Sequence, residues 1–478
     1  MPFSDDGRII VKHQMYHLLP FRFEPLNDHY DILVNEVGDY LIEPLGTAHQ
    51  IANREINENE ELFKDLTANF FISETKTPAL IDNLASRYRT KKSFLDSFTS
   101  LHIFVLTLRC NQNCIYCQAS SRDKNAKQSD ISSTDLDLAI NLMFMSPSTA
   151  ITMEFQGGEP TLAFEKLKYA VEKTEILNKE FEKHITYVLC TNCINLTSLQ
   201  LSFLKEHNIL ISTSLDGPEF LHNQNRGKTD GYQNTIKGIQ NARDIIGHDR
   251  ISALMTTSNE SLNFSKEIID AYLQNGFSEI FLRALNPYGL AKDNIWDDYN
   301  TCFLSFYFKT LDYILELNFK GIRFVENFTT LFLKKILTPF CIGFVDLQSP
   351  AGIINSVVVY NYDGYVYASD ESRMIAENND YSFQIGHLSD SYNDIFFSSK
   401  VGEIAQVWSN ESLAGCSDCA FQAYCGADPV RNYSTQGDPY GYRPKSFFCK
   451  RNKAIIKHLL LLMDEHPEVL KVFKSWIK

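Results

Sequence analysis

The sequence has 478 residues, 44% of them hydrophobic, so the chain is long enough to bury the cores of two or three domains. Its 59 acidic and 45 basic residues give a net charge of −14, which argues against a phosphate-binding surface and against nucleic acid as a partner. We find no secretion signal and no apolar run of the ~18 residues that a membrane helix needs. We therefore expect a cytoplasmic protein whose eleven cysteines serve as metal ligands rather than disulfide partners.

Residues 1–98 carry no metal-ligand spacing and are predicted to form a small α+β domain. A short hairpin is expected from 30–35 and 39–42, followed by amphipathic helices near 48–56 and 60–69. Strands followed by small helices are typical of a winged-helix-like module. Such a module can hold a peptide by adding its strand to a sheet edge, and it can equally be a packing extension without a ligand.

Residues 99–290 alternate between short apolar runs and helical stretches. This alternation predicts an α/β fold in which parallel strands are joined by right-handed crossovers. Six such units make a partial (β/α)6 TIM barrel, and catalytic groups in such barrels lie at the carboxyl ends of the strands. The expected strands are 102–108, 150–155, 185–190, 209–214, 251–257 and 279–284, and the expected helices lie near 133–144, 163–180, 196–206, 231–244 and 261–274.

The first predicted strand leads into three closely spaced cysteines, Cys110, Cys114 and Cys117. Thiolates at this spacing in one loop can reach three irons of a single cubane, whereas a closed [4Fe-4S] site needs four cysteines. The fourth iron stays open, and an open coordination position distinguishes a working metal site from a structural one. Half of a zinc site is the alternative, but zinc needs a fourth ligand and this spacing matches zinc sites poorly.

The second predicted strand leads into Gln156, Gly157, Gly158, Glu159 and Pro160. Two glycines let the backbone pass close to a ligand, and a carboxylate beside them can accept hydrogen bonds from an ammonium group. An isolated segment of this kind is also typical of a strand-to-helix turn with a capping glutamate. Its place one β/α unit after the three-cysteine loop favours ligand binding.

After the sixth strand the pattern changes, and residues 291–340 are predicted to form a helical bridge with helices at 297–320 and 326–337. Cys302 lies among aromatic residues of this bridge and is expected to be buried. Cys190, which ends the third predicted strand, is likewise expected in the core. Neither thiol is assigned to a metal site.

Residues 341–478 form a cysteine-rich C-terminal region. Four thiolates close a [4Fe-4S] cluster without a free iron, which suits electron transfer. A four-cysteine zinc site is the alternative. The four cysteines are Cys416, Cys419, Cys425 and Cys449.

The three-cysteine loop followed by Gly-Gly-Glu-Pro resembles the radical S-adenosylmethionine (SAM) superfamily. The resemblance implies that SAM binds the open iron and is cleaved reductively to a 5′-deoxyadenosyl radical, which takes a hydrogen atom from the substrate. It also implies SAM contacts from Tyr116 and from residues 156–159, the latter holding the SAM amino group. Ser214 would bind the ribose, and Arg226 would bind the carboxylate because a guanidinium forms bidentate charge-assisted bonds.

The C-terminal cysteines resemble the SPASM extension of peptide-modifying radical SAM enzymes, which holds two auxiliary [4Fe-4S] clusters. Ser369 and Pro429 stand where that pattern has cysteines, and of the first cluster's ligands only Cys341 is plainly left. We therefore expect one auxiliary cluster and two clusters in total. Asp370 matches the aspartate that serves as a base in sulfatase maturases, so it is a candidate proton acceptor or a turn residue.

Residues 416–429 and 442–449 look most like the B-type maturase of the His-Xaa-Ser repeat peptide system. The resemblance implies an oxidoreductase that modifies a ribosomal precursor peptide, whose leader the N-terminal module would hold. It implies a second radical SAM protein of the same system as partner, and flavodoxin or ferredoxin as electron donor. Two alternatives remain. A sulfatase maturase would form formylglycine but normally keeps both auxiliary clusters, and a metal-stabilised binding module would have no activity.

Overall fold

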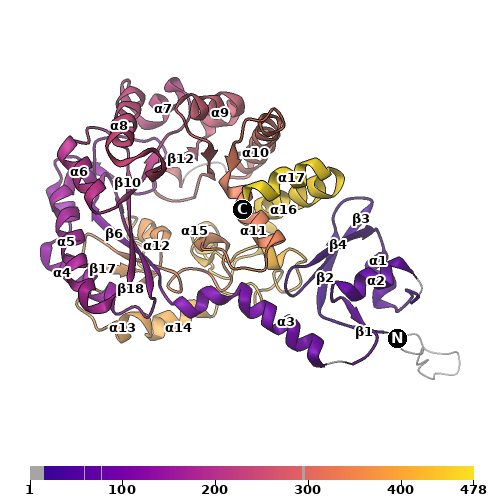
Figure 1. Cartoon of the computed structure of the whole chain (residues 1–478). Helices are drawn as coiled ribbons and strands as arrows, with labels where there is room; N and C mark the ends of the chain where they lie inside the picture. Colours follow the sequence, from indigo (N-terminus) through magenta and orange to yellow (C-terminus); the bar gives the residue numbers. More distant parts are fainter. Residues whose placement is uncertain (1–15, 59, 77, 293–295, 478) are drawn as a thin grey trace.

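The protein is described by a computed structural model that covers residues 16–58, 60–76, 78–292 and 296–477 (Figure 1). Its centre is one large sheet, in which six strands from residues 99–290 run parallel to one another. The parallel strands are β6 (Leu101–Thr107), β9 (Ala150–Gly157), β10 (His184–Thr191), β11 (Leu210–Ser214), β12 (Ile251–Thr257) and β14 (Leu282–Ala284). The main helices between them are α4 (Ser133–Phe144), α5 (Phe164–Phe181), α6 (Ser198–Glu206), α7 (Glu219–Arg226), α8 (Gly231–Ile246) and α9 (Ser265–Gln274).

Strands predicted from the sequence are present close to their expected bounds, with one difference at 279–284. This segment is divided at Phe281 into β13 (Glu279–Ile280) and β14, because β13 pairs with β15 (Val325–Glu326) while β14 pairs with β12. The five predicted helices are also present, and α7 was not predicted.

The C-terminal region adds three strands to the same sheet. β16 (Val357–Tyr360) pairs parallel with β6, and β17 (Tyr365–Tyr367) and β18 (Gln384–His387) follow antiparallel. The resulting order is β14-β12-β11-β10-β9-β6-β16-β17-β18. The predicted domain boundary at residue 341 remains a prediction, and the sheet is continuous across it.

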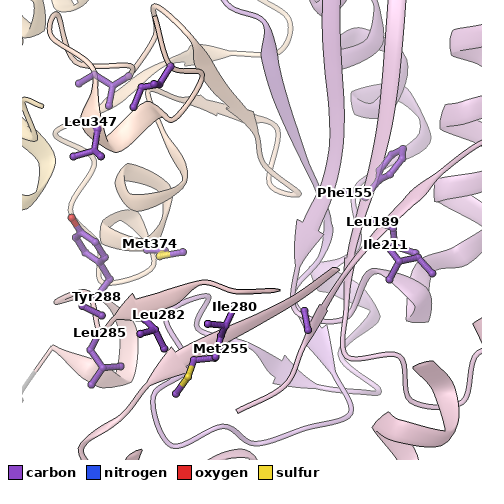
Figure 2. Packing of buried hydrophobic residues seen from close by; sticks show 14 of the residues in the cluster. Phe155, Leu189, Ile211, Met255, Ile280, Leu282, Leu285, Tyr288, Leu347 and Met374 are labelled. Carbon is purple, nitrogen blue, oxygen red and sulfur yellow. The ribbon is translucent and has the colours of Figure 1, made fainter. Parts of the chain in front are cut away.

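The strands of the parallel sheet separate apolar from polar side chains by their alternation. Phe155, Leu189 and Ile211 are paired in register on neighbouring strands and lie together on the face that the helices cover (Figure 2). Glu154 and Gln156 alternate with Phe155 and therefore point to the opposite face. Helices α4 to α9 lie along the outside of the sheet, so the polar positions of β9 face the inside of the partial barrel (Figure 1).

The N-terminal region forms a separate antiparallel sheet of three strands. The predicted hairpin and the two predicted helices are present, and Tyr16, Leu33, Phe63 and Phe71 form a core of their own. The elements are β1 (His17–Leu18), β2 (Phe21–Pro25), β3 (Tyr30–Asn35), β4 (Tyr40–Pro44), α1 (Thr47–Ala52), α2 (Glu61–Ala68), β5 (Ile72–Ser73) and α3 (Pro78–Lys91).

The helical bridge consists of α10 (Trp296–Phe319) and α11 (Asn327–Leu337), as expected. The prediction that Cys302 is buried was wrong, since its side chain is exposed. The buried face of α10 is formed by Phe303, Phe306 and Tyr307, and Cys302 lies outside it. The later helices are α12 (Asp370–Ala376), α13 (Tyr392–Phe396), α14 (Ser399–Ala405), α15 (Pro429–Gln436), α16 (Phe447–Glu465) and α17 (Pro467–Trp476). In the part of the chain that the structure covers, no helix is long and apolar enough to cross a membrane.

Candidate active site

The three-cysteine loop follows β6 directly, at the carboxyl end of the parallel sheet. Cys110, Cys114 and Cys117 are all partly buried. Burial raises the pKa of Cys110 to about 12 and that of Cys114 to about 11. Thiolates in this loop therefore need positive charge beside them, which the irons of a cluster supply. The donor set fits the predicted [4Fe-4S] cluster.

Hydrogen bonds hold this loop at both of its ends. The guanidinium of Arg109 donates from Nε and Nη2 to the two carboxylate oxygens of Asp130, at 2.7 and 2.8 Å. Between the cysteines, the backbone N–H of Ile115 donates to the carbonyl oxygen of Asn225 at 2.8 Å. The loop is thus fixed to the segment before α4 and to the last turn of α7.

The two glycines after β9 are needed because the chain passes directly against the loop. A Cβ at Gly157, whose φ is +126°, would lie 2.2 Å from the carbonyl oxygen of Thr107. A Cβ at Gly158 would lie 2.3 Å from the carbonyl oxygen of Arg109. The backbone N–H groups of Gly158 and Glu159 donate to these same two oxygens, at 2.9 and 2.7 Å. The Gly-Gly segment therefore supports the backbone that carries Cys110.

The carboxylate of Glu159 is already surrounded by donors of the protein. It accepts from the hydroxyls of Thr161 and Thr191, both at 2.7 Å, and from the backbone N–H of Asn192 at 2.8 Å. The side chain is buried, and burial raises its pKa. Glu159 thus joins the carboxyl ends of β9 and β10, while its contact with the SAM amino group stays a prediction.

Tyr116 and Arg226 meet at Asp216, which the sequence analysis did not assign. Arg226 donates from Nε and Nη2 to the two oxygens of Asp216 at 3.0 and 3.1 Å, and the Tyr116 hydroxyl donates to Oδ2 at 2.5 Å. Burial opposes ionisation of Asp216, yet the Arg226 guanidinium keeps its pKa below the usual value. Arg226 Nη1 also lies 4.0 Å from the Cys114 sulfur. The buried pair therefore supports the loop, and the predicted contact of Arg226 with the SAM carboxylate is untested.

Ser214 ends β11, beside Leu254 of β12. Cys190 was expected in the core, but its side chain is only partly buried on the inner face of β10. Its thiol donates to Glu154 Oε1 at 3.5 Å. The prediction failed because in β10 the neighbours Leu189 and Thr191, not Cys190, face the buried side.

A cavity of about 280 Å³ lies on the inner face of the sheet. Gln156, one of the predicted SAM contacts, lines it and donates to Glu154. Asp370, the candidate proton acceptor, lines it at the start of α12 and accepts from Arg373 Nε and Nη2 at 3.2 and 3.1 Å. The remaining ionisable residues on its wall are Arg283, Asp346 and Glu371.

The four C-terminal cysteines are all partly buried. Burial raises the pKa of Cys416 to about 11 and that of Cys419 to about 12, so this set also needs cationic ligands. Each of these thiols, and that of Cys449, interacts electrostatically with Cys425. Within the described ranges, no three His, Cys, Asp or Glu side chains are placed to hold a single metal ion, so zinc and a cluster both stay predictions at these cysteines. The donor types fit a four-thiolate cluster.

The positions where SPASM cysteines are missing have ordinary structural roles. The Ser369 hydroxyl caps α12 by accepting from Ser372 N at 3.2 Å. Pro429 begins α15, after the capping residue Asp428. The Cys341 sulfur accepts a hydrogen bond from the Ser93 hydroxyl at 3.3 Å. The expectation of a single auxiliary cluster stays a prediction.

Known proteins support the assignment of the loop. Residues 104–263 match the profile of the Radical SAM superfamily. The cysteine-type anaerobic sulfatase-maturating enzyme of Clostridium perfringens (strain ATCC 13124) is 28% identical over 189 residues, which are 37% of this chain and 50% of that enzyme. The alignments with three curated relatives cover 50% to 66% of those proteins' own lengths.

Two solved structures share the fold of most of the chain. Native anSMEcpe with bound AdoMet superposes with a TM-score of 0.61 at 19% identity, over 78% of this chain and 99% of that one. Streptococcus suis SuiB bound to precursor peptide SuiA superposes with a TM-score of 0.53 at 14% identity, over 91% of this chain and 100% of that one. The profile match identifies residues 104–263 as a radical SAM domain, and this part of the chain is similar in sequence to a sulfatase-maturating enzyme.

Proposed function

We propose that this protein is a radical SAM maturase that modifies a ribosomally made peptide, of the His-Xaa-Ser repeat type that its C-terminal sequence resembles. The observation that carries the proposal is the position of the three-cysteine loop, which is fixed at the carboxyl ends of the parallel strands. Gln156, in the segment that supports this loop, also lines the cavity on the inner face. A side chain of a substrate can therefore reach the site from the cavity.

When bound, the cluster and SAM supply the hydrogen abstraction, and the protein positions the substrate and excludes water. Residues 156–159 and the Arg226–Asp216 pair keep the loop in place. Asp370 is the proton acceptor for the oxidised substrate, and its two hydrogen bonds from Arg373 fix the carboxylate toward the cavity. Cys416, Cys419, Cys425 and Cys449 would hold the auxiliary cluster, which would supply electron transfer when bound.

The N-terminal sheet is the proposed site for the precursor's leader. Its strand β2 is held against the auxiliary-cluster region, since Arg22 donates to the carbonyl of Ser417 and Lys457 Nζ donates to that of Pro25 at 2.6 Å. The opposite edge strand, β4, is then the one to which a peptide strand adds. SuiB, with which the chain shares its fold, was solved with its precursor peptide bound.

The direct test is an anaerobic reaction of reconstituted enzyme with SAM, a reductant and a precursor peptide that contains His-Xaa-Ser repeats. We expect release of 5′-deoxyadenosine and a mass loss of about two hydrogens per repeat. Cys114→Ala should abolish both, whereas Cys302→Ala is the matched control because that thiol is exposed and outside both cysteine sets. No 5′-deoxyadenosine from iron-loaded enzyme would refute the proposal. Adding the second radical SAM protein of the system, and replacing the chemical reductant with flavodoxin or ferredoxin, tests the two protein partners.

Formylglycine formation is the second candidate. It is favoured by the similarity to the Clostridium perfringens enzyme and by the position of Asp370 on the cavity wall. An aldehyde that reacts with a hydrazide probe on a Cys- or Ser-containing peptide would support this activity. A crosslinked, hydrazide-negative product would exclude it.

A further inference from the structure

The inner-face cavity is lined by more acidic than basic side chains. Four carboxylates line it, and the cation among its lining residues is Arg283. Apolar side chains also line the cavity: Leu101, Ile103, Leu254, Phe281, Phe344, Val345 and Val357. The volume of about 280 Å³ is at the small end of ligand pockets, so the cavity has room for a side chain rather than for a long segment. The carboxylates are Glu154, Asp346, Asp370 and Glu371.

One of these carboxylates, Glu371, is poorly compensated by its neighbours. Asp370 accepts from Arg373, and Glu154 accepts from Gln156 and Cys190. By contrast, among the residues that the structure covers, Glu371 has one charged partner, Arg283, whose nearest nitrogen is 4.0 Å away.

The raised pKa of Glu371 also shows that its negative charge is poorly compensated. Burial, together with the nearby carboxylates of Asp346 and Asp370, raises the pKa of Glu371 to about 7. The pKa of Asp346 is also raised, chiefly by burial. Arg283, Arg431 and Arg451 offset part of the charge at Asp346, whereas the opposing cation at Glu371 is Arg283. A cation inside the cavity would therefore favour the ionised form of Glu371.

A smaller chamber of about 30 Å³ adjoins the cavity and shares Arg283 and Asp346 with it. Arg451 lines this chamber, is 5% exposed, and has two buried guanidinium nitrogens, Nε and Nη1, without a hydrogen-bond partner in the described part of the chain. Buried donors without an acceptor are unfavourable, so an acceptor oxygen from outside the chain would stabilise the Arg451 guanidinium. A chamber of this size accommodates a single oxygen-bearing group.

We propose that the cavity and its side chamber bind a residue of the peptide with a cationic side chain. Its charged end faces Glu371 and Asp370, its methylene groups pack on the apolar wall, and a backbone carbonyl oxygen of the peptide accepts from Arg451. Long cationic side chains suit such a site because their stems are apolar. This inference rests on the proposed function, whose substrate class it specifies.

The test uses iron-loaded enzyme with SAM and blocked pentapeptides Gly-Gly-Xaa-Gly-Gly, in which Xaa is Lys, Gln or Glu. Anaerobic calorimetry should show the Lys peptide binding at least tenfold tighter than the Gln peptide, with the Glu peptide weakest. Glu371→Gln should reduce the Lys preference at least threefold, while the exposed Glu403→Gln leaves it unchanged. Arg451→Met should weaken all three peptides alike, and Arg451→Lys should restore part of the affinity.

Equal affinity for the Lys and Gln peptides would overturn the inference, as would an unchanged preference in Glu371→Gln. Unchanged peptide affinities in Arg451→Met would overturn the carbonyl contact. They would indicate that the chamber holds only water, so that Arg451 does not contact the peptide. Release of 5′-deoxyadenosine is measured on the same preparations. If it occurs without any Lys preference, only this inference fails; if it is absent while the preference remains, the proposed function fails.

Discussion

Asp216→Asn should destabilise the protein far more than an exposed Asp→Asn change. Asp216 is fully buried and accepts two hydrogen bonds from Arg226, at 3.0 and 3.1 Å, and one from Tyr116 at 2.5 Å. Asparagine leaves the buried Arg226 charge without its partner, which costs about 3–5 kcal/mol. Since 1 kcal/mol shifts the melting temperature of a domain of this size by roughly 2–4 °C, we expect a fall of roughly 6–20 °C.

Anaerobic differential scanning calorimetry of the iron-loaded protein measures this shift. Asp244→Asn is the matched control, because Asp244 is exposed on α8 of the same domain and should change stability by about 0.5 kcal/mol or less. The double change Asp216→Asn with Arg226→Met should cost less than the sum of the two single changes, since it removes both charges. A melting temperature of Asp216→Asn within about 2 °C of the wild type would refute the supporting role of this pair.

Three further changes test other parts of the site. Gly158→Ala puts a Cβ 2.3 Å from the Arg109 carbonyl oxygen, so it should lower the free energy of unfolding by roughly 1–3 kcal/mol and lower the iron content. Calorimetry and iron analysis measure these two effects, and wild-type values of both would show that the close approach is unimportant. The wild-type protein should bind about eight irons. Cys341→Ala should keep all of them, and Cys425→Ala should keep about four. About twelve irons in the wild-type protein would contradict the single auxiliary cluster. Burial and neighbouring carboxylates raise the pKa of Glu371 to about 7. Above pH 4.5 the folded state therefore keeps a proton that the unfolded chain has lost. The stability that this proton provides is present at low pH and is lost as the pH rises through about 7. Glu371→Gln should therefore gain stability relative to the wild type between pH 5 and pH 8, and an equal difference at both values in thermal melts would argue against the raised pKa.

The parallel strands could be predicted because each is a short apolar run bounded by turn residues. The division at Phe281 could not, since β13 pairs with β15, which lies more than forty residues later in the chain. For the same reason the sequence did not show that β16 joins the sheet beside β6. α7 was missed because its short sequence is mostly polar, although Leu221 and Arg226 are buried in it.

Sequence spacing was sufficient for the three-cysteine loop and the Gly-Gly segment, which the structure brings together. It was insufficient where a residue's partner is distant. Asp216 resembled a polar turn until its position between Tyr116 and Arg226 was known. Cys190 ends an apolar run, but only the strand register shows that it faces Glu154. Strand alternation at Glu154 and Gln156 was the available signal for a polar inner face.

The central claim is that one iron of the cluster at Cys110, Cys114 and Cys117 has no protein ligand and binds SAM. Electron paramagnetic resonance of the reduced Cys416→Ala, Cys419→Ala variant, which keeps only that cluster, tests it most directly. We expect the cluster signal to change when SAM is added and 5′-deoxyadenosine to form. A signal indifferent to SAM, or a mononuclear zinc in its place, would contradict the account.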